Sequence, residues 1–353
     1  MSGVLHLARP EIVALAPYSP ARWDPALVRL HANENPWRGA ADRTRAGLNR
    51  YPEPQSSLLI DRLAALYGVA PEQVLVGRGS DEGIDLLVRT FCRAGQDQVL
   101  ICPPTFAMYR FAAAVQGAGV IEVPLRREDG FALDAGAVLA ACTPATRLVF
   151  LCSPNNPTGN QLDRQAVRRI VEGLAGRALV VIDEAYVEFS SAGSLAPWLA
   201  RYGHLAILRT LSKAYGLAGA RCGAVLAAPE VTGLLRRVIP PYAVSAQTIE
   251  AATDALAGDG VEACRDQVRR LVEERGRVAA RLASVPLVSK VWPSEANFLL
   301  VESPDPGRLL EAGIAAGLLV RDVRGQAGLS GCLRVTIGSP DQNERLLAAL
   351  EAA

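Results

Sequence analysis

Short apolar runs alternate with amphipathic stretches along the first two thirds of the chain. The apolar runs have the length of buried strands and occupy residues 73–76, 98–102, 120–123, 147–152, 178–182 and 205–209. Because each run is apolar at consecutive positions and the stretches between runs follow a helical period, the pattern predicts an α/β fold. In this fold a largely parallel sheet is covered by helices on both faces.

The pattern changes from about residue 246. A long helical segment is predicted over residues 261–282. Shorter strand candidates follow at residues 298–301, 318–321 and 333–337. They indicate a smaller α+β domain, and a chain of 353 residues is long enough for two domains. We therefore expect a large domain over residues 29–245, a small domain over residues 246–353, and an N-terminal arm, residues 1–28, associated with the small domain.

Composition and charge favour chemistry on small molecules. No apolar run approaches the ~20 residues of a membrane span, and residues 9–11 (Arg-Pro-Glu) interrupt the stretch in which a signal peptide would have its apolar core, so we expect a cytoplasmic protein. The seven cysteines include no Cys-x-x-Cys pair, so neither a disulfide framework nor a metal site is expected. A net charge of +1 without a basic tract argues against nucleic acid as a partner.

The use of basic residues singles out one side chain. Of the 37 basic residues only Lys213 and Lys290 are lysines. A surface charge can be either type, but an amine that must lose its proton and attack a carbonyl cannot be replaced by a guanidinium. Lys290 lies beside a turn-like segment, and we attribute the presence of a lysine at this position to chance. Lys213 is the candidate nucleophile.

Polar segments follow the predicted strands at residues 77–82, 153–159, 183–186 and 210–213. In an open parallel sheet, ligands bind beyond the carboxyl ends of the strands, where loops meet helix N-termini. These segments are therefore expected to meet at one site.

Two of the segments look like nucleotide-binding motifs only in part. The glycines of residues 77–83 are spaced one residue too widely for a dinucleotide fingerprint, although Ser80 and Asp81 would open a helix whose N-terminus suits a phosphate. Residues 180–184 are similar to a Walker B strand, but neither lysine follows glycine as a P-loop requires. Asp183, at the end of a buried strand, therefore needs another partner.

A protonated pyridine nitrogen supplies such a partner. Pyridoxal 5′-phosphate (PLP) withdraws electrons best when a carboxylate such as Asp183 keeps that proton in place, and Lys213 would hold PLP as a Schiff base. Asn156 and Tyr186 can hydrogen-bond the ring hydroxyl, and Tyr109 offers a flat face for stacking. The neighbours of the lysine that suit a phosphate are Thr210, Ser212 and Arg221.

In their order along the chain, these segments resemble the fold-type I, class II aminotransferases, and within them the histidinol-phosphate aminotransferases. The resemblance covers nearly the whole chain and is carried by residues 32–36 (Ala-Asn-Glu-Asn-Pro), 50–52 (Arg-Tyr-Pro), 79–82, 102–109, 153–159, 183–186, 209–214 and 329–334. The Asn-Asn-Pro-Thr-Gly, Asp-Glu-Ala-Tyr and Thr-Leu-Ser-Lys segments are typical of the broad family. Arg-Tyr-Pro and Leu-Ser-Gly-Cys-Leu-Arg point to the narrower one.

The resemblance implies a PLP-dependent transferase fold of type I, with a mostly parallel seven-stranded sheet in the large domain. It implies that Lys213 carries the cofactor, that Asp183 pairs with the ring nitrogen, that Asn156 and Tyr186 hold the ring oxygen, and that Tyr109 stacks on the ring. It also implies a homodimer, because the residues around the cofactor phosphate include one from a second subunit: Ser80, Asp81, Thr210, Ser212, Arg221 and, across the interface, Tyr51.

By the same resemblance, Arg334 clamps the anionic group of the substrate with Asn156 nearby, and the further substrate contacts are Arg321, Tyr18 and Asn33. The chain has Tyr215 and Gly216 where relatives have Phe and Ala, which changes the packing behind the lysine.

The implied reaction is a reversible ping-pong transamination. It converts L-histidinol phosphate and 2-oxoglutarate into imidazole-acetol phosphate and L-glutamate, a step of histidine biosynthesis. Alternatives on the same scaffold are a broad-range or aromatic aminotransferase and a threonine-phosphate decarboxylase. A PLP-binding module without turnover is a further alternative from a different class, and the chain shows no helix-turn-helix segment that would favour it.

Overall fold

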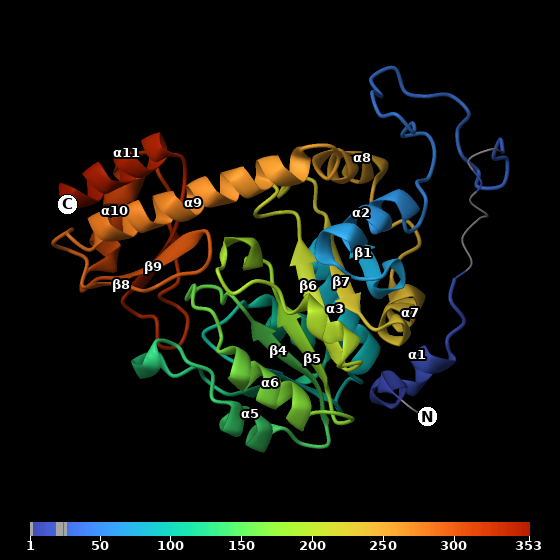
Figure 1. Ribbon diagram of the computed structural model, residues 1–353, viewed down its shortest axis with the longest axis horizontal. Coiled ribbons are helices and arrows are strands. Elements are labelled where there is room, and N and C mark those ends of the chain that lie inside the picture. The colour runs from blue at the N-terminus through green and yellow to red at the C-terminus, as the bar shows by residue number, and fades with distance from the viewer. Residues whose placement is uncertain (1–2, 19–23, 25–26) are drawn as a thin grey trace.

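The computed structural model describes residues 3–18, 24 and 27–353, and a seven-stranded sheet forms the centre of the large domain (Figure 1). The strands run in the order β1-β7-β6-β5-β4-β2-β3. Their bounds are β1 (Val74–Gly77), β2 (Gln98–Ile101), β3 (Gly119–Glu122), β4 (Thr146–Cys152), β5 (Leu179–Asp183), β6 (Leu205–Thr210) and β7 (Gly223–Ala227). The apolar runs of the sequence therefore locate six of these strands correctly.

The sheet is mostly parallel, as predicted. Strands β3, β2, β4, β5 and β6 pair in parallel, whereas β7 is antiparallel to both of its neighbours, β1 and β6. The pattern analysis did not locate β7, because its sequence, Gly-Ala-Val-Leu-Ala, is rich in small residues and has only one β-branched residue, Val225. The seven strands that the family resemblance implied are nevertheless present.

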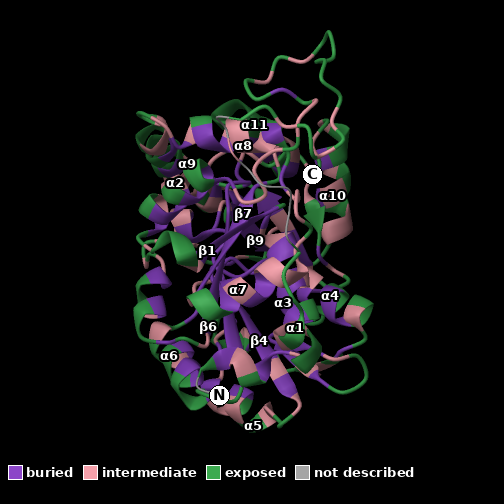
Figure 2. Ribbon diagram, turned by 90° about the vertical axis from the view of Figure 1, so that its right-hand side faces the viewer, coloured by how far each residue is buried: buried purple, intermediate pink, exposed green. Residues whose placement is uncertain are grey.

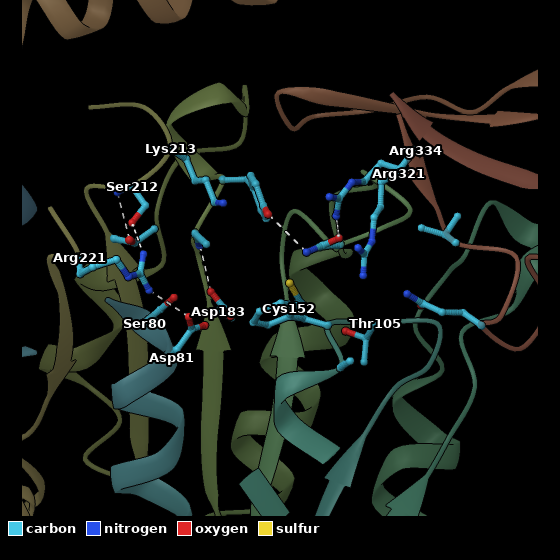
Figure 3. A pocket seen from close by; sticks show the side chains of 18 residues that line it. Ser80, Asp81, Thr105, Cys152, Asp183, Ser212, Lys213, Arg221, Arg321 and Arg334 are labelled. Atoms are coloured by element: carbon cyan, nitrogen blue, oxygen red, sulfur yellow. Dashed lines mark hydrogen bonds and ion pairs between the residues drawn. The ribbon is translucent and has the colours of Figure 1, made fainter. Parts of the chain in front are cut away.

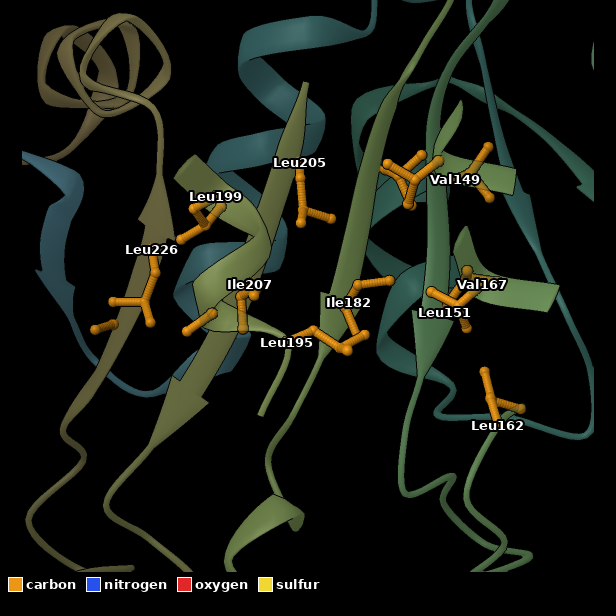
Figure 4. Close-up of a cluster of buried hydrophobic side chains, with 14 of the residues drawn as sticks. Val149, Leu151, Leu162, Val167, Ile182, Leu195, Leu199, Leu205, Ile207 and Leu226 are labelled. Carbon is orange, nitrogen blue, oxygen red and sulfur yellow. The ribbon is translucent and has the colours of Figure 1, made fainter. Parts of the chain in front are cut away.

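Helices cover both faces of this sheet, and each face has its own core. One core lies under α2 (Ser57–Tyr67), α5 (Ala135–Ala141) and α6 (Arg164–Gly173), and Figure 4 shows part of it. The other lies under α3 (Ser80–Phe91), α4 (Met108–Gln116) and α7 (Pro229–Val238). Neighbouring residues of a strand enter opposite cores, because side chains alternate along a strand. Figure 2 shows the strands buried at the centre, with exposed residues on the outer faces of the helices.

The beginning of the chain packs on the large domain. The short helices η1 (Val4–Leu7) and α1 (Pro10–Ala14) lie against α7, and Val4 and Leu7 enter the same core as α3. The Arg9 N–H donates to the Thr90 carbonyl oxygen, at 3.1 Å. The predicted association of residues 1–28 with the small domain is therefore wrong for residues 3–14; residues 1–2, 19–23 and 25–26 of that arm lie outside the described part of the chain.

The second domain is built on an antiparallel sheet of four short strands in the order β10-β11-β9-β8. Its elements, with the two helices that precede it, are α8 (Ala246–Ala255), α9 (Gly260–Leu282), β8 (Lys290–Val291), β9 (Phe298–Glu302), α10 (Pro306–Ala315), β10 (Arg321–Asp322), β11 (Cys332–Thr336) and α11 (Pro340–Glu351). The remaining 3-10 turns are η2 (Pro71–Gln73), η3 (Arg127–Asp129), η4 (Val187–Phe189) and η5 (Ala196–Ala200). Strand β10 begins at Arg321, the last residue of the strand predicted over residues 318–321, so that prediction was largely misplaced, and β8 was not predicted.

The long helix α9 connects the two domains (Figure 1). Helix α8, which precedes it, packs on α2, and its residue Ala252 belongs to the core of the large domain. The separate core of the small domain includes the C-terminal part of α9, from Val278 onward. The predicted boundary at residue 246 therefore assigns α8 to the wrong packing unit.

Among the described helices, none combines the length and the apolarity that crossing a membrane requires.

The separate core of the small domain can be tested with two leucines. Leu282 is fully buried in that core, whereas Leu319 is exposed. We expect Leu282→Ala to lower the free energy of unfolding by about 2–5 kcal/mol, because it removes buried methyl groups and leaves a cavity. Leu319→Ala should change it by less than about 0.5 kcal/mol. Urea unfolding followed by circular dichroism measures both, and equal losses would contradict this assignment of the core.

Candidate active site

The polar segments that follow the strands meet at the carboxyl edge of the large sheet, as the sequence predicted. They enclose a cavity of about 310 Å³ that the small domain closes on one side (Figure 3). The residues that line it are Ser80, Asp81, Thr105, Phe106, Ala107, Cys152, Asn156, Asp183, Ala185, Tyr186, Thr210, Ser212, Lys213, Arg221, Arg321, Val323, Gln326 and Arg334.

Lys213 lies in the loop after β6 and presents its amine to this cavity. Its Nζ is 5.7 Å from the centre of the Tyr186 ring. Partial burial lowers the pKa of Lys213, and the positive charges of Arg334 and Arg221 act in the same direction. A lowered pKa increases the share of the neutral amine, which is the form that can attack a carbonyl or accept a proton.

Asp183 ends β5, and only 2% of its surface is exposed. One carboxyl oxygen accepts a hydrogen bond from the Tyr109 hydroxyl at 2.7 Å, and the other accepts from the Ala185 N–H at 3.1 Å. Burial raises the pKa of Asp183 to about 6, and no ion pair within the described part of the chain offsets that effect. A cation beside this carboxyl would restore its ionised form.

Tyr109 holds Asp183 and does not line the cavity. Its side chain is fully buried, and its ring stacks on Phe150 with the centroids 4.8 Å apart and the planes at 9°. Phe106, which lies edge-on to Tyr109, reaches the cavity wall. The expectation that Tyr109 stacks on a bound ring is therefore corrected: Phe150 takes the face of Tyr109, and Phe106 is the aromatic side chain that a ligand would meet.

Asn156 and Tyr186 come from the loops after β4 and β5 and lie side by side. The Asn156 amide donates to the Tyr186 hydroxyl at 3.3 Å. The Tyr186 ring lies edge-on to Phe298 of the small domain, with the centroids 5.1 Å apart. Burial raises the pKa of Tyr186, so its phenol stays protonated and can donate a hydrogen bond to a ligand oxygen.

Two backbone segments approach closely at the start of α3, where an anion can bind. Gly79 precedes this helix with φ of 82°, a conformation that glycine adopts without strain. A Cβ on Gly223, at the start of β7, would lie 2.6 Å from the Gly79 carbonyl carbon and 2.7 Å from the Ser80 nitrogen. Only glycine at position 223 allows this approach. The N–H groups of Ser80 and Asp81 then open the helix toward the cavity.

Arg221 completes this anion site. Its guanidinium donates to the Ser212 hydroxyl at 3.3 Å and pairs with the Asp81 carboxylate at 3.1 Å. The Thr210 hydroxyl donates to the Cys222 carbonyl at 3.3 Å. The structure thus brings together the residues that the sequence assigned to a phosphate, apart from Tyr51.

The small domain contributes two arginines to the opposite wall (Figure 3). Arg321 and Arg334 are directly paired in the β10–β11 ladder. Arg334 donates to the Asn156 side-chain oxygen, and its buried Nε has no hydrogen-bond partner among the described residues. Burial lowers the pKa of Arg334. This wall therefore offers N–H donors and positive charge to an anionic ligand.

Three predicted residues do not reach this cavity in their own chain. Tyr51 stacks on Tyr242, with the ring centroids 4.4 Å apart, and is half exposed. Asn33 lines a separate hollow together with Tyr51, and Tyr18 is exposed.

Sequence reasoning also missed lining residues, namely Thr105, Phe106, Ala107, Cys152, Ala185, Val323 and Gln326. Thr105, Phe106, Ala107 and Ala185 lie inside segments that carry the family resemblance, so these segments were the available signal. Nothing in the sequence pattern marks Val323 and Gln326.

The described residues contain no group of three or more His, Cys, Asp or Glu side chains placed to hold a metal ion. The seven cysteines are unpaired.

Comparison with known proteins identifies the family. The sequence model for aminotransferase class I and II matches residues 29–350. The chain belongs to this family. It is 47% identical over 353 residues to the histidinol-phosphate aminotransferase of Stenotrophomonas maltophilia (strain R551-3), covering 99% of this chain and 97% of that protein.

Two solved structures show the same fold. The histidinol-phosphate aminotransferase from Sinorhizobium meliloti, in complex with pyridoxal-5′-phosphate, has a TM-score of 0.78 and 26% identity, covering 86% of this chain and 83% of that one. The L-threonine-O-3-phosphate decarboxylase from Porphyromonas gingivalis has a TM-score of 0.73 and 25% identity, covering 86% of this chain and 90% of that one. The fold alone therefore does not separate these two activities.

This class I and II aminotransferase is a PLP-dependent transaminase, and its cavity fits the cofactor. The unpaired, buried Asp183 carboxyl matches a protonated ring nitrogen. The helix N-terminus at Ser80, together with Arg221 and Ser212, matches a phosphate. Lys213, with its lowered pKa, matches the aldehyde carbon.

The raised pKa of Asp183 has a consequence for stability. In the cofactor-free protein this carboxyl binds its proton more tightly when folded, with pKa about 6, than when unfolded, with pKa 3.8. Its ionisation as the pH rises therefore lowers stability, by on the order of 3 kcal/mol above about pH 6. Asp183→Asn removes this loss, so the stability of the variant relative to wild type should rise between about pH 4 and pH 6 and stay constant above about pH 6.

Urea unfolding of both cofactor-free proteins across this pH range measures the effect. Parallel pH profiles for the two proteins would show that folding does not raise the pKa of Asp183, and they would contradict this prediction. Added PLP should stabilise wild type more than the variant, because only wild type offers a carboxylate to the ring nitrogen.

Proposed function

We propose that this transaminase moves the amino group of L-histidinol phosphate to 2-oxoglutarate, giving imidazole-acetol phosphate and L-glutamate, in histidine biosynthesis. The observation that carries the proposal is the pair of arginines, Arg321 and Arg334, which faces Lys213 across the cavity; the Arg334 Nε has no hydrogen-bond partner among the described residues. A relative 47% identical over nearly its full length is named for this substrate.

The residues divide the chemistry between them. When bound, PLP supplies an electron sink for the negative charge that develops on the substrate Cα. Lys213 anchors the cofactor, and its freed amine accepts the proton from Cα, which the lowered pKa of this amine favours. Asp183 holds the proton on the ring nitrogen, and Tyr109 fixes the carboxyl in place through its hydroxyl. Asn156 and Tyr186 orient the ring oxygen.

The arginine wall explains how one site can serve two substrates. L-Histidinol phosphate carries a phosphomethyl group where glutamate carries its α-carboxylate. Guanidinium groups bind either anion through paired N–H donors. Arg334, held by Asn156 from the large domain, would meet the anion nearest the reacting carbon in both half-reactions.

We also propose that two copies of the chain form a homodimer in which Tyr51 reaches the cofactor phosphate of the partner copy. Residues 27–51 project from the body of the molecule (Figure 1) and carry large exposed apolar side chains, among them Leu30, 91% exposed, and Trp37. Exposed apolar surface of this extent is typical of an interface. Tyr18 and Asn33 precede Tyr51 in the chain, so the same dimer is the setting in which they would contact substrate. The cytoplasmic location stays a prediction from the sequence.

The substrate is tested by adding L-histidinol phosphate alone to the PLP-loaded protein and following its visible absorption. We expect rapid conversion to the pyridoxamine form and recovery on addition of 2-oxoglutarate, with phenylalanine and threonine phosphate much slower. Arg334→Gln should lower kcat/KM for histidinol phosphate by about 10²-fold, because it removes a charge-assisted pair of hydrogen bonds.

A cofactor signal that histidinol phosphate leaves unchanged would rule out this substrate. Faster conversion by phenylalanine would favour the broad-range or aromatic aminotransferase. Release of carbon dioxide from threonine phosphate would favour the decarboxylase, and a signal that no amine changes would favour a module without turnover.

The dimer is tested by mixing two variants that are each defective alone, Lys213→Ala and Tyr51→Ala. If Tyr51 serves the partner's cavity, a mixed dimer contains one site with both native residues, and mixing should restore activity to about a quarter of wild type. If both residues serve the same cavity, no mixed dimer has an intact site, and activity would not exceed that of Tyr51→Ala alone.

A further inference from the structure

A buried cluster of three charged side chains lies behind the strands that carry the catalytic residues. It consists of Glu184, Glu188 and Arg209, and we call it the rear ion cluster. The Arg209 guanidinium lies 2.6 Å from a Glu188 carboxylate oxygen and 3.5 Å from one of Glu184. No side chain of the three is more than 14% exposed. None of these residues lines the cofactor cavity.

The cluster sits on the opposite face of the sheet from the catalytic groups. Side chains alternate along a strand, so Glu184 points away from the face that Asp183 occupies, and Arg209 points away from the face of Thr210. The apolar neighbours agree, since Ile182 and Ile207 belong to the core beneath α2, whereas Val181 and Leu208 belong to the core beneath α3 and α4.

The cluster lies where the backbone ladder between the two strands ends. The last paired residues of β5 and β6 are Asp183 and Leu208, and the Glu184 N–H donates to the Leu208 carbonyl at 3.0 Å. Beyond this point the two segments of the chain separate. The segment after β5 continues to Tyr186, and the segment after β6 continues to Lys213. Side chains bridge the gap between these two segments, because Arg209 contacts both Glu184 and Glu188, which follow β5.

The surroundings hold Arg209 in one orientation. Its guanidinium lies over the Tyr67 ring of α2, 4.3 Å from the centroid. Glu184 is held in turn by the Ser194 hydroxyl at 2.5 Å and the Leu195 N–H at 2.6 Å. A planar guanidinium that meets two carboxylates and a ring at once cannot be replaced by an ammonium group without losing contacts.

We propose that Arg209 is a positioning residue: by tying the ends of β5 and β6 together from behind the sheet, it fixes Lys213 relative to Asp183. The proposal rests on the cofactor roles given above to these two residues, and not on the identity of the substrate. A shift of about 1 Å in such a pair can cost about 10²-fold in rate.

The opposite edge of the same sheet offers a matched control. There Asp97, also buried, pairs with Arg93 at 2.7 Å and with Arg147 of β4 at 2.9 Å. This cluster ties elements together in the same way, but it lies at the amino ends of the strands, far from the cavity. Arg147→Lys therefore reproduces the loss of an arginine contact to a buried carboxylate without a link to the catalytic residues.

The experiment compares Arg209→Lys with Arg147→Lys in PLP-loaded protein. One readout is the pH midpoint of the visible absorption of the bound cofactor, which depends on the surroundings of Lys213 and Asp183 and needs no substrate. The other is the split between kcat and KM with whichever amino donor wild type uses. For Arg209→Lys we expect the midpoint to move by more than about half a pH unit and kcat to fall about 10- to 100-fold, with KM within about threefold. Arg147→Lys should lower only the thermal midpoint.

A conservative variant separates geometry from charge. Glu188→Gln keeps an oxygen that accepts from Arg209, so it should retain at least about half of the wild-type kcat and an unmoved absorption midpoint. If Arg209→Lys fails to fold, Glu188→Ala replaces it: this change removes the 2.6 Å contact of the Arg209 guanidinium and leaves only the 3.5 Å contact with Glu184, so it should move the midpoint in the same direction as Arg209→Lys.

An unmoved midpoint and a wild-type kcat in a folded Arg209 or Glu188→Ala variant would overturn the proposal. Equal changes in Arg209→Lys and Arg147→Lys would overturn it too. A wild-type protein that ignores histidinol phosphate but shows the bound-cofactor absorption would reject only the proposed substrate, since the absorption midpoint can still be compared.

Discussion

The buried carboxyl of Asp183 is the group on which the rest of the site depends. It lies at the end of a fully buried strand with two hydrogen bonds and no ion pair among the described residues, and burial raises its pKa. A buried acid in this condition is costly unless a ligand brings positive charge to it. The folded protein therefore contains a buried carboxyl without a compensating positive charge, and a protonated pyridine nitrogen supplies that charge.

The other groups of the site lie around Asp183 at the carboxyl edge of the sheet. Parallel strands end at the same edge, so segments distant in the sequence bring Lys213, Asn156, Tyr186 and Ser80 to one cavity. The antiparallel β7 contributes differently: its first residue, Gly223, lets the backbone pass close to the start of the phosphate-facing helix. Strand direction and one missing side chain thus account for much of the cofactor site.

The small domain supplies the two arginines on the opposite wall of the cavity. Its own core supports a short antiparallel ladder in which Arg321 and Arg334 are neighbours, and Arg334 reaches across to Asn156 of the large domain. The cofactor groups therefore come mainly from the large domain and the two arginines from the small domain, and the two domains also pack together outside the cavity, for example where Trp292 contacts Phe131. The solved structures with the same fold include both a transaminase and a decarboxylase, so this scaffold serves more than one reaction.

The sequence by itself determined six of the seven strands of the large sheet, the long helix α9, and the edge of the sheet at which the loops meet. It also identified Lys213 and Asp183 as the main candidate residues of the site. These features depend on local periodicity and on motifs whose members are adjacent in the chain. Only the tertiary structure decided that Tyr109 holds Asp183 while Phe106 lines the wall, that residues 3–14 pack on the large domain, that α8 joins the large core, and that Arg209 bridges two strand ends. The physical reason is that each of these outcomes is a choice among partners far away in sequence, and packing and burial make that choice once the whole chain has folded.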